Sequence, residues 1–193
     1  PVNSPLPENI EAEVSIKVGD KITTDHIIPA GARMKYRSNI ERYADFVFEP
    51  LDPSFPSRAL DLKDRGGQGI IVAGVSYGQG SSREHAAICP MHLGVKAVIA
   101  LSFERIHAAN LINFGILPLR FNANSDYEAI EAGDNLHIPD IRTRVASSGT
   151  VTIHNRTRGA TFQGTLELSE REKEILLAGG ALNLAKKQGS TQA

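Results

Sequence analysis

The chain has 193 residues, of which 41% are hydrophobic and 22% charged, and its formal net charge is −1. These values suit a single globular domain with its own core, and the charge argues against a nucleic-acid-binding or membrane surface. No run of 18 apolar residues occurs, so we expect no membrane span. Cys89 is the only cysteine, which excludes an internal disulfide and favours a reducing compartment, so we expect a cytoplasmic protein.

The two ends of the chain differ in composition from its middle. Residues 1–12 contain three prolines and few apolar side chains, so we expect them to be a linker from an upstream domain. We expect the folded domain over residues 13–185 and a disordered tail over residues 186–193.

The first predicted strand leads into a polar motif. Apolar residues alternate with polar ones over residues 14–18, which predicts a strand, and a turn follows at Gly19. The motif Thr-Thr-Asp-His comes next, at residues 23–26. Taken alone, Asp25 and His26 are typical of a turn and a helix cap rather than of catalysis.

The most informative stretch is GIIVAGVSYGQGSSREHAA, residues 69–87. It predicts a short buried strand, a glycine loop, and a helix with Ser81 or Ser82 as its N-cap. Such a junction directs backbone N–H groups and the helix dipole at one point, which favours an anion. The hydroxyls and the guanidinium of Arg83 add donors and a fixed positive charge there.

Other interpretations of this loop are weaker or stay open. The dinucleotide pattern G-x-G-x-x-G is incomplete, because Arg83 stands where the third glycine belongs. A Walker phosphate loop is excluded, since no Gly-Lys-Ser/Thr follows the glycines. A purely structural helix start remains open, although a cation in the first turn opposes the dipole unless an anion offsets it.

The remainder of the chain predicts an α/β fold in two parts. Residues 96–101 and 116–119 predict further buried strands, and apolar spacing over residues 103–113 predicts a helix between them. This order predicts βαβ units and a mainly parallel core, with active groups at the carboxyl ends of the strands. Turn pairs within residues 121–168 predict a β-rich C-terminal layer, and residues 169–172 predict a capping box that opens a last helix.

Residues 77–87 resemble the signature of the mobile C-terminal, or swivel, domain of the aconitase superfamily, which covers aconitase, homoaconitase and isopropylmalate isomerase. The resemblance continues in residues 19–26, 29–31 and 102–119, so it covers most of residues 14–120. It implies a swivelling β/β/α domain of a hydro-lyase that acts on a small di- or tricarboxylate.

The resemblance also implies roles within the glycine loop. Ser81 is implied as the base that removes a proton from a carbon beside a carboxylate. Ser82 and Arg83 are implied to bind the substrate, and Gly78 and Gly80 to support the shape of the loop. A serine can act as a base only where donors and positive charge hold its alkoxide.

Two residues outside the loop gain roles from the same resemblance. Asp25 is implied to lie at the active site as a catalytic group. Arg37 is implied to bind a second substrate carboxylate, although the nearby Arg33 leaves this assignment open on spacing alone.

The family's iron–sulfur chemistry needs more ligands than this chain has. A 4Fe-4S cluster is held by several thiolates, whereas this sequence contains one cysteine and six histidines without metal-ligand spacing. We therefore expect the chain to bind no cofactor itself. The resemblance implies that N-terminal cluster-bearing aconitase domains, or a large subunit, complete the active site.

The loop favours one branch of the superfamily. Isopropylmalate isomerase small subunits typically have a Cys in the G-x-G and Ala-Pro-Trp after Glu-His, where this chain has Gln79 and Ala86-Ala87. The chain is therefore most similar to bacterial aconitate hydratases. These enzymes isomerise citrate and isocitrate through cis-aconitate. The small subunit of isopropylmalate isomerase or homoaconitase is the alternative. A non-catalytic anion-binding module is another, and the basic residues are too sparse to support RNA binding.

Overall fold

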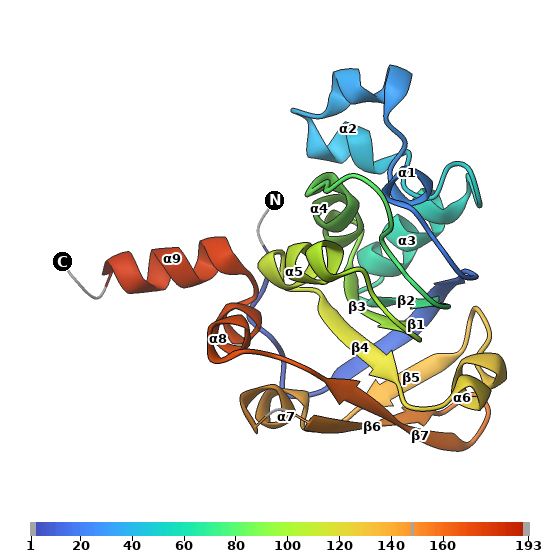
Figure 1. The fold of residues 1–193 in the computed structure, drawn as a ribbon, viewed down its shortest axis with the longest axis vertical. Helices are drawn as coiled ribbons and strands as arrows, with labels where there is room; N and C mark the ends of the chain where they lie inside the picture. Colours follow the sequence, from blue (N-terminus) through green and yellow to red (C-terminus); the bar gives the residue numbers. More distant parts are fainter. Residues whose placement is uncertain (1–2, 148, 191–193) are drawn as a thin grey trace.

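The computed structural model describes residues 3–147 and 149–190, and seven strands of this part form a closed barrel (Figure 1). The order around the barrel is β1-β2-β3-β4-β7-β6-β5. The strands are β1 (Ile10–Lys17), β2 (Gly69–Ala73), β3 (Val95–Ala100), β4 (Leu117–Phe121), β5 (Asn135–Ile138), β6 (Gly149–Asn155) and β7 (Ala160–Leu166).

One half of the barrel is parallel. Strands β1 to β4 pair in parallel in chain order, and the helices α3 (Phe55–Asp64), α4 (His85–His92) and α5 (Arg105–Asn113) precede β2, β3 and β4 respectively. Every residue of β2 is buried, as expected for a strand covered on both faces. The predicted parallel βαβ core is therefore confirmed.

The other half is antiparallel and closes the barrel. Strand β4 pairs with β7, β7 with β6, β6 with β5, and β5 with β1, all in antiparallel register. This is the predicted β-rich C-terminal layer. The sequence did not predict that it would meet β1 and complete a barrel.

Two hydrophobic cores follow from the alternation of side chains along each strand. In β2, Ile70 and Val72 belong to the cluster that fills the barrel, together with residues of all the other strands. Ile71 and Ala73 belong to the cluster that lies under the helices. The strand is thus fixed on both faces, and the loop that follows it leaves from a rigid base.

A helical arm connects β1 to α3. It contains α1 (Thr24–Ile27), the 3-10 helix η1 (Gly31–Tyr36) and α2 (Ile40–Ala44), drawn in blue at the top of Figure 1. Helix α2 packs against α4. This contact places the arm beside the helix that follows the glycine loop.

The remaining helices lie around the antiparallel half and the C-terminus. They are α6 (Asn124–Ala129), α7 (Ile141–Ser147), α8 (Glu170–Ala178) and α9 (Ala181–Ser190). The predicted capping box of Ser169 and Glu172 opens α8 and is confirmed. None of the helices in the described chain has the length and apolar character to cross a membrane.

The chain ends differ from what composition predicts. Strand β1 begins at Ile10, inside the expected linker, and Asn3 is buried with its amide donating to the carbonyl oxygens of Phe114 and Gly115. Helix α9 continues to Ser190 through most of the expected disordered tail, while residues 191–193 lie outside the described chain. Tertiary contacts and helix continuation order these ends despite their polar composition.

Candidate functional site

The glycine loop after β2 is held between the segments that follow β1 and β3. The backbone N–H of Gly78 donates to the carbonyl oxygen of Ile22 at 2.7 Å, and that of Tyr77 donates to Ser102 at 3.0 Å. Isolated parallel bridges, Thr23 to Gln79 and Tyr77 to Phe103, continue the order of the parallel strands past their carboxyl ends. The loop is therefore fixed at the edge of the sheet where active groups were expected.

Glycine is required at Gly78. This residue and Gly80 have φ values of +93° and +95°, which favour glycine. A Cβ at Gly78 would lie 2.3 Å from the ring of His107, which also packs against Tyr77 with ring centroids 5.3 Å apart. The absent side chain thus allows the loop to rest on α5.

His107 is a feature that the sequence analysis missed. Its side chain is buried, and neither ring nitrogen has a hydrogen-bond partner in the described chain. Burial lowers the pKa of His107 from 6.5 to about 4, so the ring is neutral at pH 7. Only its helical spacing on the predicted helix of residues 103–113 hinted that it faces the core.

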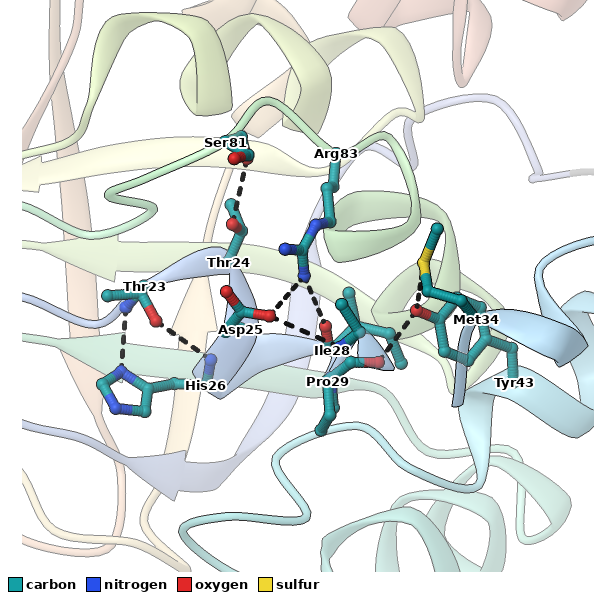
Figure 2. A network of polar contacts seen from close by, with 11 residues as sticks. Thr23, Thr24, Asp25, His26, Ile28, Pro29, Met34, Tyr43, Ser81 and Arg83 are labelled. Carbon is teal, nitrogen blue, oxygen red and sulfur yellow. Dashed lines mark hydrogen bonds and ion pairs between the residues drawn. The ribbon is translucent and has the colours of Figure 1, made fainter. Parts of the chain in front are cut away.

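The helix after the loop begins later than predicted. Helix α4 starts at His85 with Glu84 as N-cap, whereas Ser81 or Ser82 was expected there. Thr24 explains the difference, because its hydroxyl donates to the carbonyl oxygen of Ser81 at 2.9 Å and holds this segment away from a helical path (Figure 2). Arg83 is consequently outside the first helical turn.

The segment just before α4 carries a row of backbone N–H donors. The N–H groups of residues 80–84 donate no hydrogen bond to any acceptor in the described chain. The Ser81 hydroxyl is exposed, and the Ser82 hydroxyl accepts a long hydrogen bond, 3.4 Å, from the amide of Asn110. Asn110 was also missed, since nothing in the sequence pairs α5 with this loop. The segment offers several donors to one ligand.

Arg83 joins the loop to the Thr-Thr-Asp-His motif. Its Nη1 donates to Asp25 Oδ1 at 2.7 Å and to the carbonyl oxygen of Ile28 at 3.2 Å (Figure 2). The hydrogen bond from Arg83 lowers the pKa of Asp25, which keeps this carboxylate ionised at pH 7. Two motifs that are distant in sequence therefore form one polar cluster.

His26 takes part in a helix cap, as its sequence context predicts, with Thr23 as the N-cap residue. The Thr23 hydroxyl accepts from the His26 N–H at 3.1 Å, and the Thr23 N–H donates to His26 Nδ1 at 3.0 Å (Figure 2). These two hydrogen bonds form a capping box at the start of α1. The same helix turn presents Asp25 to Arg83.

The two candidate arginines of the arm have different surroundings. Arg33 makes a double hydrogen bond to Glu49, with distances of 2.6 and 3.1 Å, and lies over the ring of Phe46. Arg37 is exposed, and its side chain makes no hydrogen bond or ion pair with other described residues. Arg33 is thus occupied within the fold, while Arg37 is available to a ligand.

A cavity of about 230 Å³ lies beside the loop. Its lining includes Thr24, Gly80, Ser82, His107 and Asn110. It joins the site residues of the loop to the two α5 residues that the sequence analysis did not identify.

The residues of the site do not fit an iron–sulfur cluster. No group of three or more His, Cys, Asp or Glu side chains in residues 3–147 and 149–190 could hold a metal ion. Cys89 is fully buried in α4, and burial raises the pKa of its thiol to about 12, which opposes the thiolate that a cluster requires.

Comparison with known proteins identifies similar chains. Residues 14–124 match the family model of the aconitase C-terminal domain. The chain is 34% identical to a probable mitochondrial aconitate hydratase of Caenorhabditis elegans and 29% identical to the mitochondrial homocitrate dehydratase of Saccharomyces cerevisiae, each match covering 91% of this chain and 25% of the relative. The chain thus spans about a quarter of the length of these curated relatives.

One solved structure is similar over nearly its whole length. It is a 3-isopropylmalate dehydratase from Methanocaldococcus jannaschii, with 34% sequence identity and a TM-score of 0.76. The match covers 95% of this chain and 97% of that chain. It supports the fold independently of the longer relatives.

The relatives correct the expected location. The curated aconitate hydratases of Caenorhabditis elegans, Dictyostelium discoideum and Aspergillus fumigatus are mitochondrial, which contradicts the expectation of a cytoplasmic protein. A single unpaired cysteine indicated a reducing compartment, but it carries no information that separates one such compartment from another.

Proposed function

Because the chain belongs to the aconitase family as its C-terminal domain, we propose that it is the substrate-binding and proton-abstracting domain of a hydro-lyase that isomerises citrate and isocitrate through cis-aconitate. The observation that carries this proposal is the polar cluster of Asp25, Ser81 and Arg83, in which two sequence motifs meet (Figure 2). The similarity to aconitate hydratases over most of the chain supports this substrate class.

Ser81 removes the proton from the carbon beside a carboxylate in this proposal. Its hydroxyl is exposed beside the free N–H groups of residues 80–84, close to the start of α4. These donors and the positive charge of Arg83 favour the alkoxide form that a serine base needs. The proton passes from carbon to Ser81 Oγ, and the electron pair stays on the substrate for elimination.

Arg83 binds the carboxylate beside that carbon. Within the described chain both hydrogen bonds of Arg83 use Nη1, so Nε and Nη2 remain for a two-point contact with a carboxylate. Asp25 keeps the guanidinium in this orientation through its 2.7 Å contact. Asp25 therefore contributes by positioning Arg83 as well as by its own negative charge.

Arg37 and Ser82 bind the remaining part of the acid. The guanidinium of Arg37, which has no partner among the described residues, suits a second carboxylate, whereas Arg33 is held by Glu49. The Ser82 hydroxyl donates a hydrogen bond to the substrate, while the Asn110 amide donates a hydrogen bond to the Ser82 oxygen. An acid with two or three carboxylates is the ligand that two separated arginines match best.

The domain supplies only part of the chemistry. Aconitase-family enzymes hold the iron–sulfur cluster in the partner domains, and the residues described above do not fit one. We propose that cluster-bearing domains of the same protein, or a large subunit, complete the active site. The share of the curated relatives that this chain leaves uncovered supports such a partner.

The test is turnover by the complete enzyme that carries this domain. Formation of the unsaturated acid from citrate and isocitrate is followed by ultraviolet absorbance, with iron and sulfide measured in the same sample. We expect turnover by the complete enzyme and none by the purified 193-residue chain. Turnover by the chain at iron levels near zero would contradict the division of roles, and substrate binding without turnover by the complete enzyme would favour the anion-binding module.

A second candidate function has a specific observation in its favour. The similar 3-isopropylmalate dehydratase structure is 34% identical to this chain, the same identity as that of the aconitate hydratase of Caenorhabditis elegans, so sequence identity does not favour one substrate over the other. Homocitrate and isopropylmalate therefore belong in the same assay. A higher kcat/KM for either acid than for citrate would replace the aconitate hydratase assignment.

A further inference from the structure

We propose that His85 is a positioning residue that holds Arg37 in place for the substrate, an inference that rests on the proposed function of Arg37. His85 is the first residue of α4, directly after the loop, and its Nε2 lies 2.9 Å from the carbonyl oxygen of Arg37. A carbonyl oxygen only accepts, so the imidazole carries a proton on Nε2 and donates it to this hydrogen bond.

The segment that carries Arg37 is anchored upstream of this residue, where Arg33 bonds to Glu49 and the ring of Tyr36 stacks on that of Phe46. Arg37 is the C-cap of η1, a 3-10 helix with no buried residue and no side-chain hydrogen bond at its N-cap. A short helix of this kind is weakly stable without tertiary contacts. The hydrogen bond from His85 satisfies the carbonyl at its C-terminal end.

The ring of His85 makes a second contact with the arm. It lies against Tyr43, with ring centroids 5.3 Å apart. Tyr43 is fully buried, donates its hydroxyl to the carbonyl oxygen of Pro29 at 2.9 Å, and contacts the sulfur of Met34 at 3.6 Å (Figure 2). His85 and Tyr43 together therefore hold η1 near its start, within it and at its end.

His85 also links Arg37 to the other carboxylate-binding arginine. Arg83 is two residues earlier and contacts Asp25 and Ile28, near the start of the arm. Residues 83–85 thus hold the arm at two points on either side of η1. This arrangement fixes the backbone of Arg37 relative to Arg83, and so the point from which the Arg37 side chain extends to the substrate.

A purely structural role and a positioning role make different predictions. Removal of a structural histidine would lower stability without any special relation to Arg37. A positioning residue acts through Arg37, so its removal should mainly raise KM and should have no further effect once the Arg37 side chain is absent.

The first measurement does not depend on activity. Hydrogen exchange of a peptide covering residues 31–39 is compared in the complete enzyme and its His85→Ala, His85→Gln and His92→Ala variants. We expect about threefold to tenfold faster exchange in His85→Ala, because one hydrogen bond and one ring contact are lost. His85→Gln retains an Nε2–H donor and should restore protection from exchange. His92→Ala is the matched control, because it removes a histidine from the other end of the same helix.

The second measurement is a double-mutant cycle with Arg37→Ala. We expect His85→Ala to raise KM about threefold to tenfold with a smaller change in kcat, and to change nothing further in the Arg37→Ala background. Additive effects, or unchanged exchange in His85→Ala, would overturn the positioning role. Absence of turnover in the wild-type enzyme would instead contradict the proposed function, and hydrogen exchange would still decide whether His85 anchors η1.

Discussion

Carboxylates in the two halves of the barrel have different surroundings. In the antiparallel half, Asp134 is buried and accepts hydrogen bonds from Arg158 and Asn155, both at 2.7 Å. Beyond the parallel strands, Asp25 is 62% exposed and is bonded to Arg83, which keeps donors free. The buried cluster satisfies its own members and stabilises a turn, whereas the exposed one leaves hydrogen-bonding capacity for a ligand.

The topology explains this difference. Parallel strands send all their carboxyl ends to one edge, where the loops after β1, β2 and β3 meet. The antiparallel strands β6 and β7 are joined by the short connection 156–159, which has little room for a binding site. Variants in the parallel-half loops should therefore alter catalysis, and variants of the antiparallel cluster should alter stability.

The largest expected effect is that of Ser81→Ala on turnover. Loss of a general base should lower kcat by about 10²–10⁴, while KM changes little because the arginines still bind the acid. Steady-state kinetics of the complete enzyme would measure this. Ser57→Ala, which removes an exposed hydroxyl from α3, is the matched control. Near-normal turnover of Ser81→Ala would show that another group removes the proton.

Asp134→Ala should have the next largest effect, on stability. It would leave the buried amide of Asn155 without its acceptor and remove the partner of Arg158, so we expect a loss of about 3 kcal/mol in the free energy of unfolding. Asp25→Ala removes an ion pair whose carboxylate is exposed, and it should change stability by less than about 1 kcal/mol. Denaturant unfolding of both variants would test the contrast, and equal losses would refute it.

Lysine substitutions should separate the arginines by function. Arg83→Lys and Arg37→Lys keep the charge but lose the planar fork, so we expect KM to rise about tenfold to 100-fold for each. Arg33→Lys should leave KM within about twofold, because Arg33 is paired with Glu49. Equal effects at positions 33 and 37 would mean that the side chain facing the substrate has been assigned incorrectly.

The sequence predicts the parallel half better than the closure of the barrel. The apolar run of β2 and the spacing within α5 are local signals, and both elements lie where they were expected. Closure depends on β4 pairing with β7 and β1 pairing with β5, which are contacts between distant segments. Short elements such as η1 were missed for the same reason, since tertiary contacts hold them.

The candidate site was easiest to propose where its signal lies in one motif. The resemblance of residues 77–87 suggested the loop residues, and its other parts added Asp25 and Arg37; the roles of all of them stay predictions. The start of α4 was predicted wrongly, because the hydroxyl that holds Ser81 comes from Thr24, in another motif. Asn110 and His107 approach the loop from α5, so only the folded chain reveals their contacts.

The smallest expected effect is that of pH on stability. His107 in the parallel half and Asp134 in the antiparallel half should affect the free energy of unfolding in different pH ranges. Burial lowers the pKa of His107 from 6.5 to about 4 in the folded chain. As the pH falls, His107 is therefore protonated at a higher pH in the unfolded chain than in the folded one. Stability should therefore drop between about pH 7 and pH 5, by about 2 kcal/mol. Burial raises the pKa of Asp134, but its hydrogen bonds, above all that from Arg158, outweigh this and lower it, so its contribution is lost only below about pH 4.

Two variants test whether these ranges belong to the two residues. His107→Phe has no titrating group beneath the glycine loop, so the slope of unfolding free energy between about pH 7 and pH 5 should flatten. Asp134→Asn should keep that slope and flatten the fall below about pH 4. Slopes are compared rather than absolute values, because either substitution also changes packing. A wild-type slope that persists in His107→Phe would show that a group other than His107 causes the loss of stability between about pH 7 and pH 5.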